Sequence, residues 1–199
     1  MTVPNPSRFP SVNGLLIAAT IAAFAAEAAL GDDFVEPLVL WPLGAGFAPW
    51  QLVTYAFMHA GIWHLAFNMI GLRSFGADLE RLWGGRRFAV FYFTCALSAA
   101  LAQLAVAAIS GAQYPTAGAS GAVFGLLLAF AWNFPRRRVM LLFPPIPMPA
   151  PVFVAVYGVI ELVLGVTGTQ EGVAHFAHLG GMAGGYLLLR RWRACPRED

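Results

Sequence analysis

Six apolar stretches divide this chain and constrain its fold more than any other feature. They cover residues 12–31, 63–82, 87–109, 119–134, 151–168 and 174–192. A helix of about 20 apolar residues crosses the roughly 30 Å hydrocarbon layer of a bilayer, where backbone groups must pair within the helix because there is no water. Only 11% of the residues are charged, against about 25% in soluble domains. The pattern predicts an all-α membrane protein, a bundle of six transmembrane helices.

The arginines predict how these helices are oriented. All twelve basic residues are Arg, and eleven of them lie near the chain ends or in every second connection: Arg8, Arg81, Arg86, Arg87, Arg136, Arg137, Arg138, Arg190, Arg191, Arg193 and Arg197. The connections near 32–62, 110–118 and 169–173 contain no Arg, and only Arg73, inside the second stretch, departs from the pattern. Because cytoplasmic connections are rich in basic residues, we expect both termini in the cytoplasm and the chain in the cell (inner) membrane.

Residues 32–62 form the one long connection, which is rich in aromatic residues and weakly charged. Such a segment is more typical of the membrane interface than of a separate folded domain, so we expect a membrane-interface loop between the first two helices. The chain has no internal repeat and no low-complexity tract. Residues 1–199 are therefore expected to form a single domain.

Six strongly polar residues lie in or beside the apolar stretches, towards the predicted non-cytoplasmic side. They are His59, His64, Asn68, Ser120, His175 and His178. Ionisable and strongly polar groups in a membrane span are costly, so each of them is a candidate for function. Every histidine of the chain belongs to this set.

Ser120 lies in the sequence Gly118-Ala119-Ser120-Gly121. The pattern G-x-S-G is short enough to arise by chance, and from it alone a serine N-cap on a helix packed through small residues stays open. Its depth favours a function. Arg136 follows 16 residues later, roughly 24 Å of helix, which places Ser120 below the outer surface. Non-helical backbone at that depth must line protein or a water-filled cavity, as a hydrolase inside a membrane requires.

His178 is expected at a similar depth, because Arg190 follows 12 residues later, or roughly 18 Å along a helix. Faces of small residues allow two helices to approach closely, and the fourth and sixth stretches each carry one. These faces are Gly121 with Gly125 and Gly181 with Gly185. If they meet, Ser120 and His178 lie side by side, and a neutral imidazole takes the serine proton and returns it to a leaving amine.

No acid lies at a spacing that suggests a third member, so the pattern predicts a Ser–His dyad. Gln103, Asn133 and Glu161 are expected to form hydrogen bonds between helices.

His64 and Asn68 are four residues apart and so share one helix face. A ring N–H and an amide N–H are suitable donors for an oxyanion, although a polar clamp between helices remains an alternative. His59 and His175 are expected to bond backbone carbonyls in irregular segments near the interface.

Three motifs together resemble the rhomboid family of intramembrane serine proteases, in its minimal six-span bacterial form. They are His64-Leu65-Ala66-Phe67-Asn68 (H-x-x-x-N), Gly118-Ala119-Ser120-Gly121 with Gly125 (G-x-S-G-x-x-x-G), and Ala177-His178 with Gly181 and Gly185 (A-H-x-x-G-x-x-x-G). They occur in the family's order, on the second, fourth and sixth stretches. The resemblance covers essentially the whole chain. One departure is Trp50-Gln51, where the family has Trp-Arg, which removes a possible arginine anchor from the loop.

The resemblance implies Ser120 as nucleophile and His178 as general base and acid. It implies that His64 and Asn68 stabilise the oxyanion beside the Ser120 backbone N–H. His59 matches a further histidine that often precedes the H-x-x-x-N motif. With the motif glycines Gly118 and Gly121, it is expected to support the site.

The expected function is therefore that of a serine endopeptidase, a hydrolase that cleaves transmembrane protein substrates near the outer face of the lipid bilayer. No cofactor and no nucleic-acid partner is expected. One alternative is a catalytically silent rhomboid-like binding or chaperone protein of the membrane. Another is a metal site formed by the four histidines, which is disfavoured because zinc sites usually include Cys or a carboxylate and no supporting acid is evident.

Overall fold

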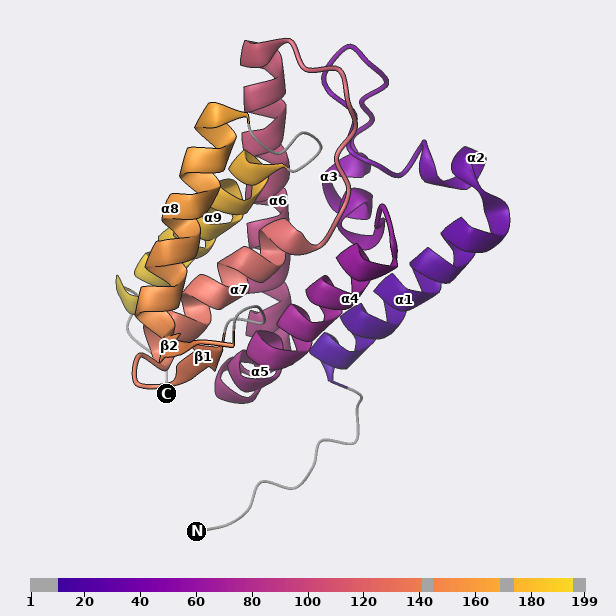
Figure 1. Cartoon of the computed structure of the whole chain (residues 1–199). Helices are drawn as coiled ribbons and strands as arrows, with labels where there is room; N and C mark the ends of the chain where they lie inside the picture. Colours follow the sequence, from indigo (N-terminus) through magenta and orange to yellow (C-terminus); the bar gives the residue numbers. More distant parts are fainter. Residues whose placement is uncertain (1–10, 141–144, 169–173, 195–199) are drawn as a thin grey trace.

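Each of the six apolar stretches forms helix in the computed structural model, which describes residues 11–140, 145–168 and 174–194 (Figure 1). The first contains α1 (Val12–Leu30), and the second contains α4 (Ile62–Gly71), the π-helical η2 (Leu72–Gly76) and α5 (Ala77–Trp83) in one continuous run. The other four contain α6 (Gly85–Ser110), α7 (Ser120–Asn133), α8 (Ala150–Thr167) and α9 (His175–Ala194). Of these, α1, α6 and α8 are long and apolar enough to cross a bilayer. The protein is a multi-pass membrane protein with a mostly helical fold; that all six segments cross stays a prediction.

Short elements occupy two of the connections. The long connection after α1 contains α2 (Asp32–Val35), α3 (Gln51–Thr54) and the 3₁₀ helix η1 (Tyr55–Phe57). Between α7 and α8, β1 (Arg138–Met140) pairs antiparallel with β2 (Pro147–Pro149). Prolines are tolerated in such a short pair because both strands are edges, where a missing N–H leaves no ladder partner unpaired. In the part of the chain that the structure describes, this hairpin and an isolated β-bridge between Leu40 and Thr116 depart from the all-α expectation.

Arginine-bearing segments gather at one end of the bundle. The junction of α5 with α6, the β1–β2 hairpin and the end of α9 all lie there (Figure 1), whereas Arg8 and Arg197 lie outside the described residues. Nη1 of Arg137 lies 3.6 Å from a carboxylate oxygen of Asp78 in α5, and the guanidinium of Arg87 lies over the ring of Trp192, 5.9 Å from its centroid. The expected clustering of these arginines on one side is thus confirmed for these segments, while the membrane and the side that they face remain predictions.

The predicted contact between the glycine faces of α7 and α9 is confirmed. A Cβ atom on Gly181 would overlap the carbonyl oxygen of Gly121, and one on Gly125 would lie 2.9 Å from the carbonyl oxygen of Gly181. Cys95 of α6 closes the third side, since a Cβ on Gly125 would lie 2.7 Å from its Cβ. Because only hydrogen atoms fit between the facing backbones, α7 and α9 pack in close contact, with the Cys95 side chain of α6 against them.

This packing predicts the effect of a single methyl group. Gly181→Ala is expected to destabilise the fold by about 1–3 kcal/mol or more, since the clash is with backbone that has little freedom to move. The matched control is Gly158→Ala in α8, whose Cβ would lie at an ordinary 3.6 Å from Met182 and whose helix propensity would improve. Thermal unfolding of both variants in detergent measures the difference; equal melting temperatures would contradict the glycine contact.

Gln51, which is buried, joins separate parts of the long connection to one another. Its side-chain oxygen accepts the Trp41 N–H at 3.1 Å, and its Nε2 donates to the carbonyl of Gly46 at 3.2 Å. The departure from the family's Trp-Arg pattern therefore leaves an anchor at this position, with an amide in place of a guanidinium. Leu40 of this connection and Thr116 exchange two backbone hydrogen bonds of 2.9 Å, which tie the connection to the segment that leads into α7.

Candidate active site

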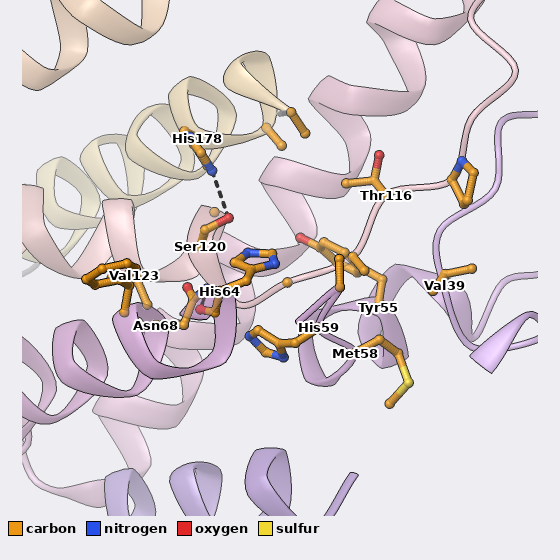
Figure 2. A pocket seen from close by; sticks show the side chains of 18 of the residues that line it. Val39, Tyr55, Met58, His59, His64, Asn68, Thr116, Ser120, Val123 and His178 are labelled. Atoms are coloured by element: carbon orange, nitrogen blue, oxygen red, sulfur yellow. Dashed lines mark hydrogen bonds between the residues drawn. The ribbon is translucent and has the colours of Figure 1, made fainter. Parts of the chain in front are cut away.

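Ser120 is the first residue of α7, and its side chain points towards His178 (Figure 2). The hydroxyl donates to Nε2 of His178 on α9 over 2.7 Å. The residue that precedes the helix is Ala119, and no side chain caps the helix. The alternative of Ser120 as a structural N-cap is therefore wrong, and the predicted pairing with His178 is present in the structure, 58 residues apart in the chain.

The ring of His178 is held on three sides. Its Nε2 faces Ser120, and its face stacks on Phe124, one turn along α7, with ring centroids 4.4 Å apart and planes 9° apart. Its Nδ1 lies 2.8 Å from Oε2 of Glu161. A neutral imidazole carries one N–H, and a carboxylate only accepts. The hydrogen-bond network therefore assigns the hydrogen to Nδ1 and leaves Nε2 to accept from Ser120.

Glu161 overturns the expectation that no acid accompanies the pair. It lies in α8, and its Oε2 also lies 2.7 Å from Nδ1 of His175, so one carboxylate oxygen meets both histidines of the first turn of α9. The bond does join two helices, as expected for Glu161, but it reaches the candidate base. His175 was expected to bond a backbone carbonyl, which is wrong. The sequence did contain a signal for this role of Glu161: an acidic residue in an otherwise apolar span, where a charge is costly.

The segment before Ser120 depends on Gly118. Its φ of +125° is a backbone conformation that other residues rarely adopt, and a Cβ there would lie 2.7 Å from Cε1 of His64. Its N–H donates to the carbonyl of Tyr55 over 2.9 Å, and the Tyr55 hydroxyl donates to the carbonyl of Ala96 over 2.7 Å. Gly118 thus lets the chain turn into α7 with the imidazole of His64 directly against it.

His59 also supports this segment. Its Nδ1 donates to the carbonyl of Phe57 over 3.2 Å, which confirms the expected bond to a backbone carbonyl. Its Nε2 accepts a long hydrogen bond of 3.5 Å from the Ala119 N–H. Burial, and secondarily the nearby His64, lowers the pKa of His59 to about 4. The ring is therefore neutral at physiological pH, which acceptance of an N–H requires.

His64 and Asn68 lie one turn apart on α4, as predicted, and both face the same cavity as Ser120 (Figure 2). The Asn68 amide donates one hydrogen to the carbonyl of His64 over 2.9 Å, and its second amide hydrogen remains for another acceptor. The rings of His59 and His64 meet edge to face, with centroids 5.0 Å apart.

The cavity has a volume of about 540 Å³ and collects five of the six polar residues that the sequence singled out. They are His59, His64, Asn68, Ser120 and His178. As the first residue of α7, Ser120 has a backbone N–H without a partner inside the helix. A substrate carbonyl beside Ser120 would therefore meet a nucleophile, a base and several N–H donors, which is the equipment of a serine hydrolase.

The structure suggests a different set of possible metal ligands from the four histidines considered in the sequence. Among the described residues, the group with metal-ligand chemistry is Glu161, His175 and His178, whose ligand atoms all lie within 4.8 Å of one another. The acid that the alternative lacked is thus present. The distances of 2.7 and 2.8 Å from the two Nδ1 atoms to Oε2 are those of hydrogen bonds, so both Nδ1 atoms have a partner without a metal, while Nε2 of His175 is buried without one.

The structure thus has a serine and a histidine joined by a hydrogen bond inside a bundle of apolar helices. These features define a class of protein: multi-pass membrane proteins with a hydrolase-type site. The family model of the Rhomboid domain matches residues 47–193. The chain belongs to the rhomboid family, which confirms the resemblance seen in the motifs.

Individual relatives match between about half and 70% of this chain, and smaller shares of their own lengths. Rhomboid protease GluP of Bacillus subtilis is 32% identical over 138 residues, which are 69% of this chain and 25% of that protein. Putative rhomboid protease YdcA of the same organism is 29% identical over 139 residues, 70% of this chain and 65% of YdcA. Rhomboid protein 1, mitochondrial, of Saccharomyces cerevisiae is 37% identical over 102 residues, 49% of this chain and 29% of that protein. The chain thus spans between a quarter and two thirds of the lengths of these relatives.

Proposed function

We propose that this protein is an intramembrane serine endopeptidase that hydrolyses peptide bonds in or next to the transmembrane helices of other membrane proteins. The observation that carries the proposal is the 2.7 Å hydrogen bond between Ser120 and His178 in a cavity among apolar helices. Two bacterial relatives bear the name of rhomboid protease, which agrees with it. The arginine pattern supports a chain in the cell (inner) membrane with both termini in the cytoplasm, and cleavage near the outer face.

The proposed reaction begins at Ser120. Its oxygen bonds to the carbonyl carbon of the scissile peptide while its proton moves to Nε2 of His178. The protonated imidazole then gives that proton to the leaving nitrogen as the carbon–nitrogen bond breaks, which leaves an acyl-enzyme on Ser120. Water, deprotonated by the same imidazole, releases the second product. The cavity supplies the space for water that an apolar bundle otherwise excludes.

The oxyanion that forms on the scissile carbonyl needs donors, and the cavity holds three of them. They are the backbone N–H of Ser120 at the start of α7, the ring of His64 and the second amide hydrogen of Asn68. The helix N-terminus adds the favourable end of the helix dipole. Preorganised donors of this kind favour the transition state more than the ground state, because the charge develops only there.

The proposal is tested by labelling the purified protein in detergent with a serine-reactive fluorophosphonate. We expect one labelled residue, Ser120, located by mass spectrometry, and no labelling after heat denaturation. An unlabelled wild-type protein that retains its fold would contradict the proposal and favour the catalytically silent binding or chaperone alternative.

Asn68→Ala tests the oxyanion role. We expect kcat for cleavage to fall by about 100-fold, the size of effect that loss of one such donor produces, with KM little changed. The chain offers a close control in Asn133→Ala. Asn133 of α7 was expected to bond another helix, but its amide donates to the carbonyl of Ala129 over 2.8 Å, the same four-residue bond that Asn68 makes to His64.

If Asn68 serves only as a polar clamp, the two variants lose stability alike and keep similar kcat values. That outcome would remove Asn68 from the proposed machinery.

A further inference from the structure

Glu161 has no part in the reaction as described so far, although it touches the proposed base. Its side chain is 9% exposed, and its Oε2 lies 2.8 Å from Nδ1 of His178 and 2.7 Å from Nδ1 of His175. We propose that Glu161 is a positioning residue that holds His178 in the tautomer able to accept the serine proton, with His175 as a second donor that keeps the carboxylate in place. This inference rests on the proposed function, because it assigns a role in that reaction.

The tautomer follows from what each atom is able to do. A carboxylate oxygen only accepts hydrogen bonds, so the histidine nitrogen that faces it carries the ring hydrogen. In His178 that nitrogen is Nδ1, and Nε2 keeps its lone pair 2.7 Å from the Ser120 oxygen. In the other tautomer Nε2 carries the hydrogen and has no lone pair for the serine proton. Glu161 therefore selects the form of His178 that acts as a base.

His175 explains why the carboxylate stays where it is. It lies three residues before His178, on the same face of α9, and both rings turn their Nδ1 towards α8. Two imidazole donors on one carboxylate oxygen restrict its rotation, since a change of rotamer breaks both bonds. The ring of His178 is in turn fixed by its stack on Phe124.

The charge on Glu161 indicates that it orients His178 and does more than join α8 to α9. A buried carboxylate is expensive, and a neutral amide would join α8 to α9 at a lower desolvation cost. The carboxylate has a use that an amide lacks: it stabilises the imidazolium that exists once His178 has taken the proton of Ser120. No proton passes to Glu161; the proton moves from Oγ to Nε2 and then to the leaving nitrogen.

A metal ion on the same three side chains is the competing explanation. It would need the Nδ1 lone pairs of His175 and His178, and these atoms would no longer donate to Glu161. The imidazole of His178 would then carry its hydrogen on Nε2 and lose its ability to accept from Ser120. A bound metal therefore predicts that a chelator raises labelling, whereas positioning by Glu161 predicts that a chelator leaves labelling unchanged.

The experiment compares fluorophosphonate labelling of wild-type protein, Glu161→Gln and Glu161→Asp in detergent. We expect the maximal labelling rate of Glu161→Gln to fall by about 100-fold, within the range that a general base contributes, with the half-saturating probe concentration little changed. Glu161→Asp keeps the charge on a shorter stem and is expected to retain an intermediate rate. Nitrogen-15 NMR of histidine-labelled protein is expected to show Nδ1–H in wild-type His178 and a gain of Nε2–H in Glu161→Gln.

The matched control is Glu80→Gln. Glu80 also joins two helices through a carboxylate that accepts two N–H groups, from Val12 at 2.7 Å and Asn13 at 3.0 Å, and it lies in α5, outside the residues that line the cavity. We expect this variant to lose stability but to label at the wild-type rate. Chelators are expected to leave wild-type labelling unchanged.

Three results would overturn the inference: a Glu161→Gln rate within about threefold of wild type, an unchanged His178 tautomer in that variant, or a wild-type labelling rate that changes when a chelator is added. The two proposals fail separately. Absence of labelling in folded wild-type protein contradicts the protease assignment, whereas normal wild-type labelling with an unaffected Glu161→Gln variant contradicts only the role of Glu161.

Discussion

Ser120→Ala is expected to abolish cleavage of every membrane-protein substrate, a loss on the order of 10⁴-fold or more. The methyl group that remains has no oxygen to bond the scissile carbon, and the water that could replace it has no fixed place opposite Nε2 of His178. The fold should survive, because the Ser120 hydroxyl makes a single side-chain hydrogen bond, to His178, and caps no helix. Co-expression of wild-type and Ser120→Ala protein with a panel of single-span membrane proteins, followed by detection of cleaved products, measures this effect.

The control for this variant is Ser98→Ala. Ser98 lies in the middle of α6 and packs towards Gly184 of α9, away from the cavity. It is expected to keep wild-type cleavage. If cleavage products persist with Ser120→Ala protein of normal melting temperature, another nucleophile is responsible, and Ser120 is not the nucleophile.

His178→Asn should have the second largest effect, a fall in kcat of about 10²–10⁴-fold. The asparagine amide occupies nearly the place of Nδ1 and so keeps a donor for Glu161, while the ring atom that accepts from Ser120 is gone. The variant therefore removes the base without leaving the carboxylate of Glu161 short of a partner, which would itself destabilise a buried charge. Single-turnover cleavage and fluorophosphonate labelling both measure the loss.

The outcome that contradicts this role is labelling of His178→Asn at the wild-type rate. A fall in melting temperature as large as that of His178→Ala would mean that the asparagine fails to preserve the contact with Glu161. The comparison of the two variants therefore separates loss of the base from loss of packing.

Much of the fold follows from local patterns in the sequence. The lengths of the apolar stretches predicted helices within a few residues of those observed, because crossing a bilayer requires a continuous apolar helix of about 20 residues. The pairing of α7 with α9 was also predictable, since Gly121, Gly125, Gly181 and Gly185 recur at one-turn spacing and leave two faces that only another backbone fills. That contact carries Ser120 to His178.

Local irregularities were harder to predict. Ser120 begins α7 instead of capping it, and the long connection contains short helices fastened by the buried amide of Gln51. Gln51 bonds residues five and ten positions away within the same connection, whereas the entry into α7 depends on residues far along the chain. The bond from Gly118 to Tyr55 and the contact of Gly118 with His64 set the direction in which the chain enters α7.

The sequence by itself thus predicted that Ser120 and His178 meet, because glycine spacing is a property of single segments, and their depth below a membrane surface stays a prediction. Only the tertiary structure decided that Glu161 bonds Nδ1 of His178. Glu161 indicates that its side of α8 faces protein, because a charge in a span is costly, but the apolar sequence of α8 does not indicate which residues it meets. Its rotation is set by packing against α7 and α9 together, and that rotation turns the Glu161 carboxylate onto the two histidines of α9.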